Sequence, residues 1–160
     1  MAEEKNTEQQ GSAPEDVFQI QKIYLKDASF ESPNSPAIHT MEWKPGLAIN
    51  VANAYNDLGN HVFEVVLRLT VTVTIGDSTA YLAEVHQAGV FTLNIPDHER
   101  LELVLQDACL RILYPYAFAS LSDMVARGGF PQLLVTPINF GDIYLNRKKQ
   151  AQQTAATEQK

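Results

Sequence analysis

Two carboxylates in one short extended segment are the residues of this sequence most suited to chemistry. Side chains alternate across a strand, so Asp27, Ser29 and Glu31 share one face of residues 26–31. A carboxylate pair acts as general acid and base when a reacting group lies between the two. No base, nucleophile or metal ligand accompanies this pair nearby, which favours a solvated strand face over a catalytic site.

The histidines and the cysteine are not spaced in the sequence like the ligands of a metal site. The histidines and the single cysteine are His39, His61, His86, His98 and Cys109. Structural and catalytic zinc sites draw on ligands at characteristic spacings, and none of these spacings occurs here. Cys109 has apolar neighbours, which favours a packed thiol over a nucleophile. His86 shares a strand face with Glu84, and a surface or interface histidine is the commoner role for such a residue.

Sequence motifs of enzymes are also missing. There is no glycine-rich phosphate loop and no nucleophile elbow. Asp107 has no serine or histidine placed to complete a triad. We therefore expect a protein that is not an enzyme and that uses no cofactor and no metal.

Charge and hydropathy restrict the partners. The chain has 160 residues, which indicates a single domain, with a formal net charge of −7 and a pI near 5.0. Nucleic-acid binding requires basic patches, so an acidic protein favours basic partners or simple solubility. No apolar run approaches the about 20 residues of a membrane span, and residues 1–4 do not resemble a signal peptide. We expect a cytoplasmic protein that neither binds nucleic acid nor inserts into a membrane.

The segment from His61 to Leu93 organises the predicted fold. Odd positions from Phe63 to Val73 are apolar, and most of the even positions between Glu64 and Thr74 are polar, as in a strand with one buried and one wet face. Turn residues 75–78 precede a second strand at about 79–93, which predicts a long antiparallel hairpin. The second arm carries semi-apolar residues on both faces, which is typical of a strand that is also covered by another subunit. Gly89 marks a bulge or a close approach.

Two further strands are predicted before the hairpin, separated by turns that contain proline and glycine. Residues 1–15 are polar and without periodicity, so we expect a disordered N-terminal tail. A strand of mixed faces follows from Val17 to Glu31, and another covers residues 47–55. Residues 32–36 and 44–46 contain the prolines and the glycine that break the chain between them.

Helical patterns are confined to the last third of the chain. Asp97 suits a helix N-cap, and apolar residues from Leu101 to Leu113 follow at helical spacing. Pro115 predicts a kink or a restart, with a second stretch at 116–127 that ends at Gly128. A last helix is expected at about 140–150, and residues 148–160 are expected to form a disordered tail. The domain at 16–147 is thus predicted to be α+β, a four-stranded antiparallel sheet with helices packed on one face.

Several aromatic residues lie near the turns outside the hairpin. These residues are Phe18, Tyr24, Phe30 and Trp43. Aromatics at a sheet margin form part of the core or, when partly exposed, an apolar groove that holds an extended peptide. The residues alone therefore indicate an acidic, oligomeric α+β binding domain.

Several segments resemble the SecB family of protein-export chaperones. Residues 18–34 resemble its first strand, and 64–72 and 84–91 resemble its central strands. Residues 113–117, 127–133 and 137–140 resemble its helix kink and its Gly-Pro loop. The similarity runs in order from about Phe18 to Leu145.

This resemblance implies a function and an assembly. SecB is an ATP-independent holdase that keeps secretory precursors unfolded in the cytoplasm and passes them to the SecA motor. It is a homotetramer, a dimer of dimers, with long helices between two sheet layers. The family's SecA-binding positions match Asp27, Glu31, Leu82 and Glu84. Its client groove matches Phe30, Trp43, Phe140 and Tyr144.

The sequence departs from the family pattern in three places, of which one is an N-terminal tail longer than usual in the family. Ala88 stands where the family often has the first of two glycines, and the segment 147–149 is basic where an acidic extension is common. The basic segment weakens the case for a second SecA contact through the tail. A holdase for a non-export client, such as an antitoxin, and a small-ligand carrier remain alternatives. An enzyme would require a cluster of perturbed titratable groups in one cleft.

Overall fold

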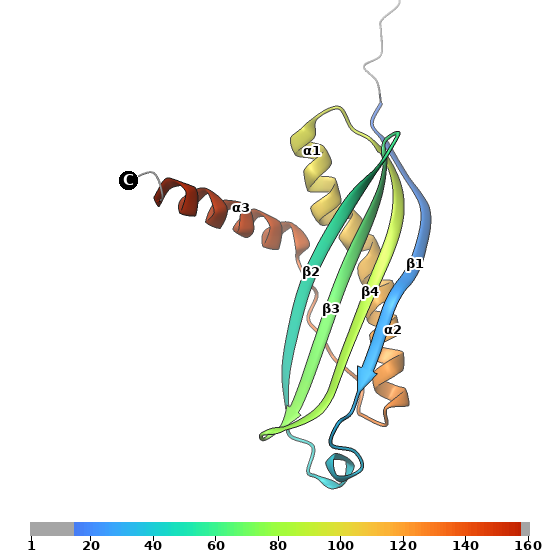
Figure 1. Ribbon diagram of the computed structural model, residues 1–160, viewed down its shortest axis with the longest axis vertical. Helices are drawn as coiled ribbons and strands as arrows, with labels where there is room; N and C mark the ends of the chain where they lie inside the picture. The colour runs from blue at the N-terminus through green and yellow to red at the C-terminus, as the bar shows by residue number, and fades with distance from the viewer. Residues whose placement is uncertain (1–14, 158–160) are drawn as a thin grey trace, which may run out of the picture.

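An antiparallel sheet forms one layer of the protein, in a computed structural model that describes residues 15–157. Its four strands are β1 (Val17–Glu31), β2 (Pro45–Gly59), β3 (Val62–Ile75) and β4 (Ser78–Asn94). The strand order is β1-β4-β3-β2, so the predicted hairpin β3–β4 is central and β1 and β2 are the edges (Figure 1). The α+β prediction, with its four-stranded antiparallel sheet, is confirmed.

Helices form the second layer. A short 3₁₀ turn, η1 (Ala37–Thr40), connects β1 to β2. The long helical layer consists of α1 (His98–Leu103), the π-helical turn η2 (Val104–Ala108) and α2 (Cys109–Arg127). These three segments follow one another along a single face of the sheet, while α3 (Phe140–Thr157) points away from the β2 side (Figure 1).

The core lies between the central strands and α2. The odd positions of β3 from Phe63 to Ile75 are all buried, whereas its even positions are mostly exposed or partly exposed. Leu113, Ala117 and Leu121 of α2 are buried in the same cluster. Burial of this apolar surface is the main stabilising contribution to the fold, at about 25 cal/mol per Å². The predicted two-faced strand is therefore confirmed.

Gly89 of β4 marks a close approach. A Cβ atom at this position would lie 2.6 Å from Cε2 of Phe91 and 3.0 Å from Cδ2 of Leu113. The register shifts of β4 lie elsewhere along the strand, so there is no bulge at the glycine itself. The glycine lets the Phe91 ring lie flat against the strand beneath α2.

Two bulges explain the mixed faces of β1. Its pairing with β4 shifts between Ile20 and Lys22 and again between Leu25 and Asp27. An extra residue in one strand reverses which face the following side chains occupy. Apolar residues face the helices in all three sections of the strand as a result. The helix-facing residues are Phe18, Ile20, Ile23, Leu25, Ala28 and Phe30.

The predicted helix signals are borne out at the two ends of the helical layer. Asp97 Oδ1 accepts hydrogen bonds from the backbone N–H groups of Glu99 (2.9 Å) and Arg100 (3.1 Å). α2 ends before Gly128, as expected. The restart at Pro115 is wrong, because α2 continues through it. Proline removes one backbone donor, and the packing of α2 against the sheet keeps the helix continuous across the missing bond.

The C-terminal helix is longer than expected. α3 continues to Thr157, so residues 148–157 are helical where we expected the start of a disordered tail. Alanine, glutamine and lysine are abundant there and have high helix propensity. The predicted N-terminal tail lies outside the described residues except for Glu15, which is exposed. Among residues 15–157, no helix is long and apolar enough to cross a membrane.

Candidate functional site

The four predicted SecA-binding residues lie together on one face of the sheet. We call the face turned away from the helices the outer face. Glu31 of β1 pairs with Leu82 of β4, and Ser29, two residues before Glu31, pairs with Glu84. Asp27 pairs with His86, one step further along the same face. Directly paired and diagonal neighbours on one face are within reach of each other, so these side chains form one acidic surface.

The members of this surface are accessible. Asp27 and Glu31 are exposed, Leu82 is 36% exposed, and the Glu84 side chain is 33% exposed. An exposed leucine beside carboxylates suits contact with a partner that presents basic and apolar groups. We call Asp27, Glu31, Leu82 and Glu84 the acidic surface.

Glu84 is held in its ionised form by its neighbours. Thr70 Oγ1 donates to Oε2 at 2.7 Å, and His86 Nε2 lies 2.7 Å from Oε1. These hydrogen bonds, that from Thr70 first, lower the pKa of Glu84 below its usual range. The Glu84–His86 pair lies on the outer face of the sheet, which agrees with the expected surface or interface role of His86.

A second carboxylate on the outer face is enclosed by three neighbours. Glu64 of β3 is only 9% exposed. Its Oε1 accepts from Lys26 Nζ at 2.7 Å and from the Tyr24 hydroxyl, and its Oε2 accepts from Asn56 Nδ2 at 3.2 Å. The bond from Lys26, followed by that from Tyr24, lowers the pKa of Glu64, and the same carboxylate raises the pKa of Tyr24 to about 12. The sequence marked Glu64 only as a polar strand position.

Aromatic side chains gather on the helix-facing side, at the end of the sheet near η1. The Phe30 ring lies 5.7 Å from Tyr81 and 6.3 Å from Phe130, and Trp43 lies 5.9 Å from Phe130. The His39 ring lies 4.6 Å from the Phe130 ring in a tilted arrangement. Tyr81 and Phe130 were not predicted as site residues, although Phe130 stands in the loop that carries the family resemblance. We call Phe30, Trp43, Tyr81 and Phe130 the aromatic cluster.

An open cavity of about 200 Å³ adjoins the aromatic cluster. Leu134 at its rim is 78% exposed, and Leu47 of β2 is also exposed. The cavity is lined by Trp43, Pro45, Leu47, Val73, Tyr81, Pro131, Gln132, Leu133 and Leu134. Trp43 is thus a partly buried wall of an accessible apolar site.

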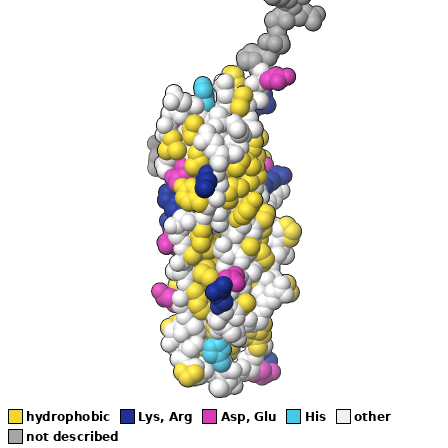
Figure 2. Space-filling model, turned by 90° about the vertical axis from the view of Figure 1, so that its right-hand side faces the viewer, with side chains coloured by type: hydrophobic (Ala, Val, Ile, Leu, Met, Phe, Trp, Pro, Cys, Tyr) yellow, Lys and Arg dark blue, Asp and Glu magenta, His cyan; other side chains and the backbone are white. Residues whose placement is uncertain are grey.

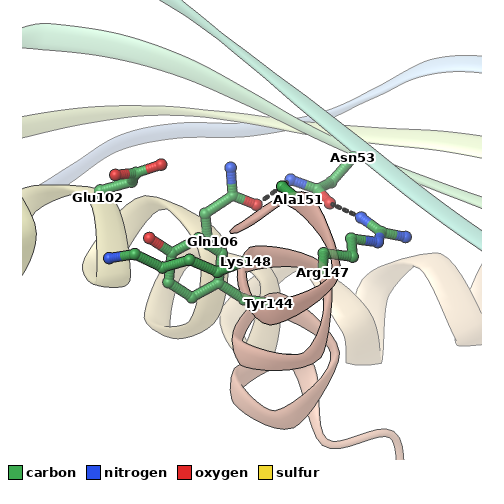
Figure 3. A pocket seen from close by; sticks show the side chains of 7 residues that line it. All are labelled: Asn53, Glu102, Gln106, Tyr144, Arg147, Lys148 and Ala151. Atoms are coloured by element: carbon green, nitrogen blue, oxygen red, sulfur yellow. Dashed lines mark hydrogen bonds between the residues drawn. The ribbon is translucent and has the colours of Figure 1, made fainter. Parts of the chain in front are cut away.

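The other two predicted groove residues lie apart from this cluster. Phe140 is 3% exposed and packs against Tyr114 at 5.8 Å, so it belongs to the core. Tyr144 lines a different cavity of about 360 Å³, where the Lys148 ammonium lies 5.9 Å from the centre of its ring (Figure 3). The prediction of one groove lined by all four residues is therefore not matched by a single cavity.

Both cavities nevertheless lie along the same strand. Leu47 lines the apolar cavity and Asn53 the polar one, and both belong to the helix-facing side of β2. Asn53 donates to Gln106 Oε1 at 2.6 Å and accepts from Arg147 at 3.3 Å (Figure 3). Between the cavities, Ile49 of β2 lines a small cavity together with Leu133, Val135 and Ile138 of the connection from α2 to α3.

The described residues form no group of histidine, cysteine and carboxylate side chains that suits a metal ion. Cys109 is fully buried, and burial raises the pKa of its thiol to about 12. A neutral, enclosed thiol is a poor nucleophile. The sequence-based interpretation of a packed thiol agrees with this environment.

An antiparallel sheet with one helical face, a charged outer face and an aromatic cavity at its edge defines an α+β domain suited to binding other proteins. The sequence model of the family described as preprotein translocase subunit SecB matches residues 9–151. The chain is 45% identical to the protein-export protein SecB of Nitrosococcus oceani over 99% of this chain and 98% of that protein. It is 43% identical to the SecB of Methylococcus capsulatus over 92% and 95% of the two chains. The chain belongs to the SecB family.

A solved structure supports the same fold. The SecB-like chaperone of Mycobacterium tuberculosis, in complex with a ChAD peptide from the HigA1 antitoxin, superposes with a TM-score of 0.63. The match covers 76% of this chain and 91% of the other at 18% sequence identity. At this identity the similarity establishes the architecture.

Proposed function

We propose that this protein is an ATP-independent holdase that binds unfolded secretory precursors in the cytoplasm and delivers them to SecA. The observation that carries the proposal is the separation of two surfaces by the thickness of the sheet. The acidic surface occupies the outer face, and the aromatic cluster with its cavity occupies the helix-facing side. Membership of a protein-export family supports this assignment.

The helix-facing side of β2 suits an extended, apolar client. β2 is an edge strand, so its outer backbone groups are free of a partner strand within the described sheet. An extended segment adds to such an edge through main-chain hydrogen bonds, and pockets take its alternate side chains. The cavity beside Trp43 supplies such a pocket. Main-chain pairing tolerates many sequences, as a general holdase requires.

The acidic surface suits a basic region of SecA. The carboxylates of Asp27, Glu31 and Glu84 lie on one face of a chain whose formal net charge is −7. Complementary charge raises the association rate and fixes orientation more than it adds affinity. A client held on the opposite side of the sheet leaves this surface free.

The exposed sheet edges support a homotetramer built as a dimer of dimers. β1 leaves Val17, Phe18, Ile20 and Leu25 exposed along its edge. Figure 2 views the protein from the side of β1 and α2 and shows hydrophobic side chains along its whole length. Long apolar edges promote association between chains, so pairing between subunits accounts for the apolar residues exposed along β1.

An aggregation assay tests the proposal. Stoichiometric protein should slow the aggregation of an unfolded precursor after dilution from denaturant, without added nucleotide. Purified SecA should then bind the protein–precursor complex. If the protein leaves the aggregation rate unchanged at equal molar ratio, the holdase proposal is wrong.

A further inference from the structure

The outward direction of the acidic surface depends on a bulge in β1. Tyr24 pairs with Ala88 and faces outward, and after the bulge Asp27 pairs with His86 and also faces outward. Without the bulge, regular alternation from Tyr24 through Lys26 would place Asp27 and Glu31 on the helix-facing side. The same slip would turn Phe30 away from Tyr81. One inserted residue, Lys26, therefore sets both candidate surfaces at this end of β1.

The inserted residue is anchored across the sheet. Lys26 Nζ lies 2.7 Å from Glu64 Oε1, although β4 separates the strands that carry the two residues. The Tyr24 hydroxyl donates to the same oxygen, so the residues on both sides of Leu25 are tied to one carboxylate. Asn56 of β2 adds a bond at 3.2 Å from the opposite edge. A single carboxylate thus connects β1, β2 and β3.

We propose that Glu64 is a positioning residue that holds the Lys26 bulge and so keeps Asp27 and Glu31 directed outward on the acidic surface. Glu64 itself contacts no partner in this account and acts through Lys26 and Tyr24. The inference rests on the proposed function for its effect on SecA, but its structural claim concerns β1 alone.

Three substitutions disturb the network while changing the net charge in different directions. Glu64→Gln removes a negative charge, Lys26→Met removes a positive charge, and Tyr24→Phe leaves the charge unchanged. Simple electrostatics predicts that Lys26→Met strengthens binding to a basic partner. Positioning predicts that all three weaken it, by about fivefold in Kd for the two charge-changing variants, equivalent to about 1 kcal/mol. Lys22→Met is the matched control, because Lys22 lies on the same face of β1 and forms no ion pair among the described residues.

Two measurements test the proposal on the full chain. Isothermal titration with purified SecA should show weaker binding for all three network variants, and unchanged binding for Lys22→Met. Amide hydrogen exchange of the protein alone should be faster at residues 25–31 in the network variants, with the exchange of β3 unchanged.

The outcomes separate this inference from the proposed function. If exchange at residues 25–31 is the same in all variants, Glu64 does not hold the bulge, and the inference is wrong whatever the SecA result. If exchange rises but Lys26→Met binds SecA as well as the parent, the positioning role for docking is wrong. If charge reversal at Glu84 also leaves SecA binding intact, the acidic surface itself is not the docking site.

Discussion

Reversing the charge of Glu84 should weaken SecA binding and spare client binding. Glu84 lies opposite Ser29 on the outer face, with Leu82 and Glu31 one step further along. Its pKa is lowered by hydrogen bonds from Thr70 and His86, so the parent side chain is ionised at neutral pH. Glu84→Lys therefore changes the charge of this surface by two units and also removes the acceptor used by Thr70.

The expected loss follows from the exposure of the side chain. Glu84 is about one-third exposed, at 33%, so solvent screens its charge. An exposed ion pair contributes about 0.2–1 kcal/mol, and reversal replaces one attraction by a repulsion of similar size. The sum, about 0.4–2 kcal/mol, corresponds to an increase in Kd of about 2- to 30-fold. The difference should shrink with added salt, since the Debye length falls to about 3 Å at 1 M.

The assay is titration of SecA into the protein at two salt concentrations, followed by titration of an unfolded precursor. Glu99→Lys is the matched control, because it makes the same charge change on an exposed residue of the helical layer. Equal weakening by Glu84→Lys and Glu99→Lys would show that only net charge matters. Parallel loss of precursor binding in Glu84→Lys would refute the separation of the two surfaces.

Three further predictions concern the groove, stability and the thiol. Trp43→Ala should weaken precursor binding by about tenfold or more, measured by calorimetry, since a buried aromatic anchor commonly contributes about 2 kcal/mol or more, and should leave SecA binding intact. Lys26 lowers the pKa of Glu64 in the folded state, so this pair stabilises the fold above the ordinary pKa of 4.5, and the stabilisation is lost as the pH falls through the folded pKa. Glu64→Gln should therefore reduce the fall in the free energy of unfolding at acidic pH, measured by urea denaturation. An unchanged pH profile of stability would contradict this prediction. Cys109, with a pKa of about 12, should react with a thiol reagent at pH 8 only after denaturation, so rapid labelling of the native protein would disprove its burial.

The alternation in β3 was sufficient to predict the central hairpin. Every second residue from Phe63 to Val73 is apolar, and a strand with one face against helices requires that pattern. Asp97 and Gly128 marked the ends of the helical layer because capping depends on local side-chain and backbone chemistry.

The faces of β1 were beyond sequence reasoning. Both bulges lie in the pairing of β1 with β4, and the second one contacts Glu64 through Lys26, although these partners are distant in sequence. Local alternation places Asp27 and Glu31 on one face of β1, but it does not tell whether this is the outer face or the helix-facing side. The bulge before them decides which it is. The network around Glu64 was missed for the same reason.

The four residues predicted for the groove lie in two places. Phe30 and Trp43 converge because both sequence breaks bring their segments to one end of the sheet, where Phe130 joins them. Phe140 and Tyr144 stand on α3, whose position depends on the path of the connection from α2. The local pattern of that connection carries no signal for its path across β2, and the groove residues implied by the family resemblance lie beside two cavities in this structure.

Hydrogen exchange of the full chain, measured separately with an unfolded precursor and with SecA, tests the central claim most directly. The precursor should protect the helix-facing side, at β2 around Leu47 and at the loop around Phe130. SecA should protect β1 from Asp27 to Glu31 and β4 around Glu84. Protection of the same segments by both partners would contradict the account, because one shared surface would then serve both.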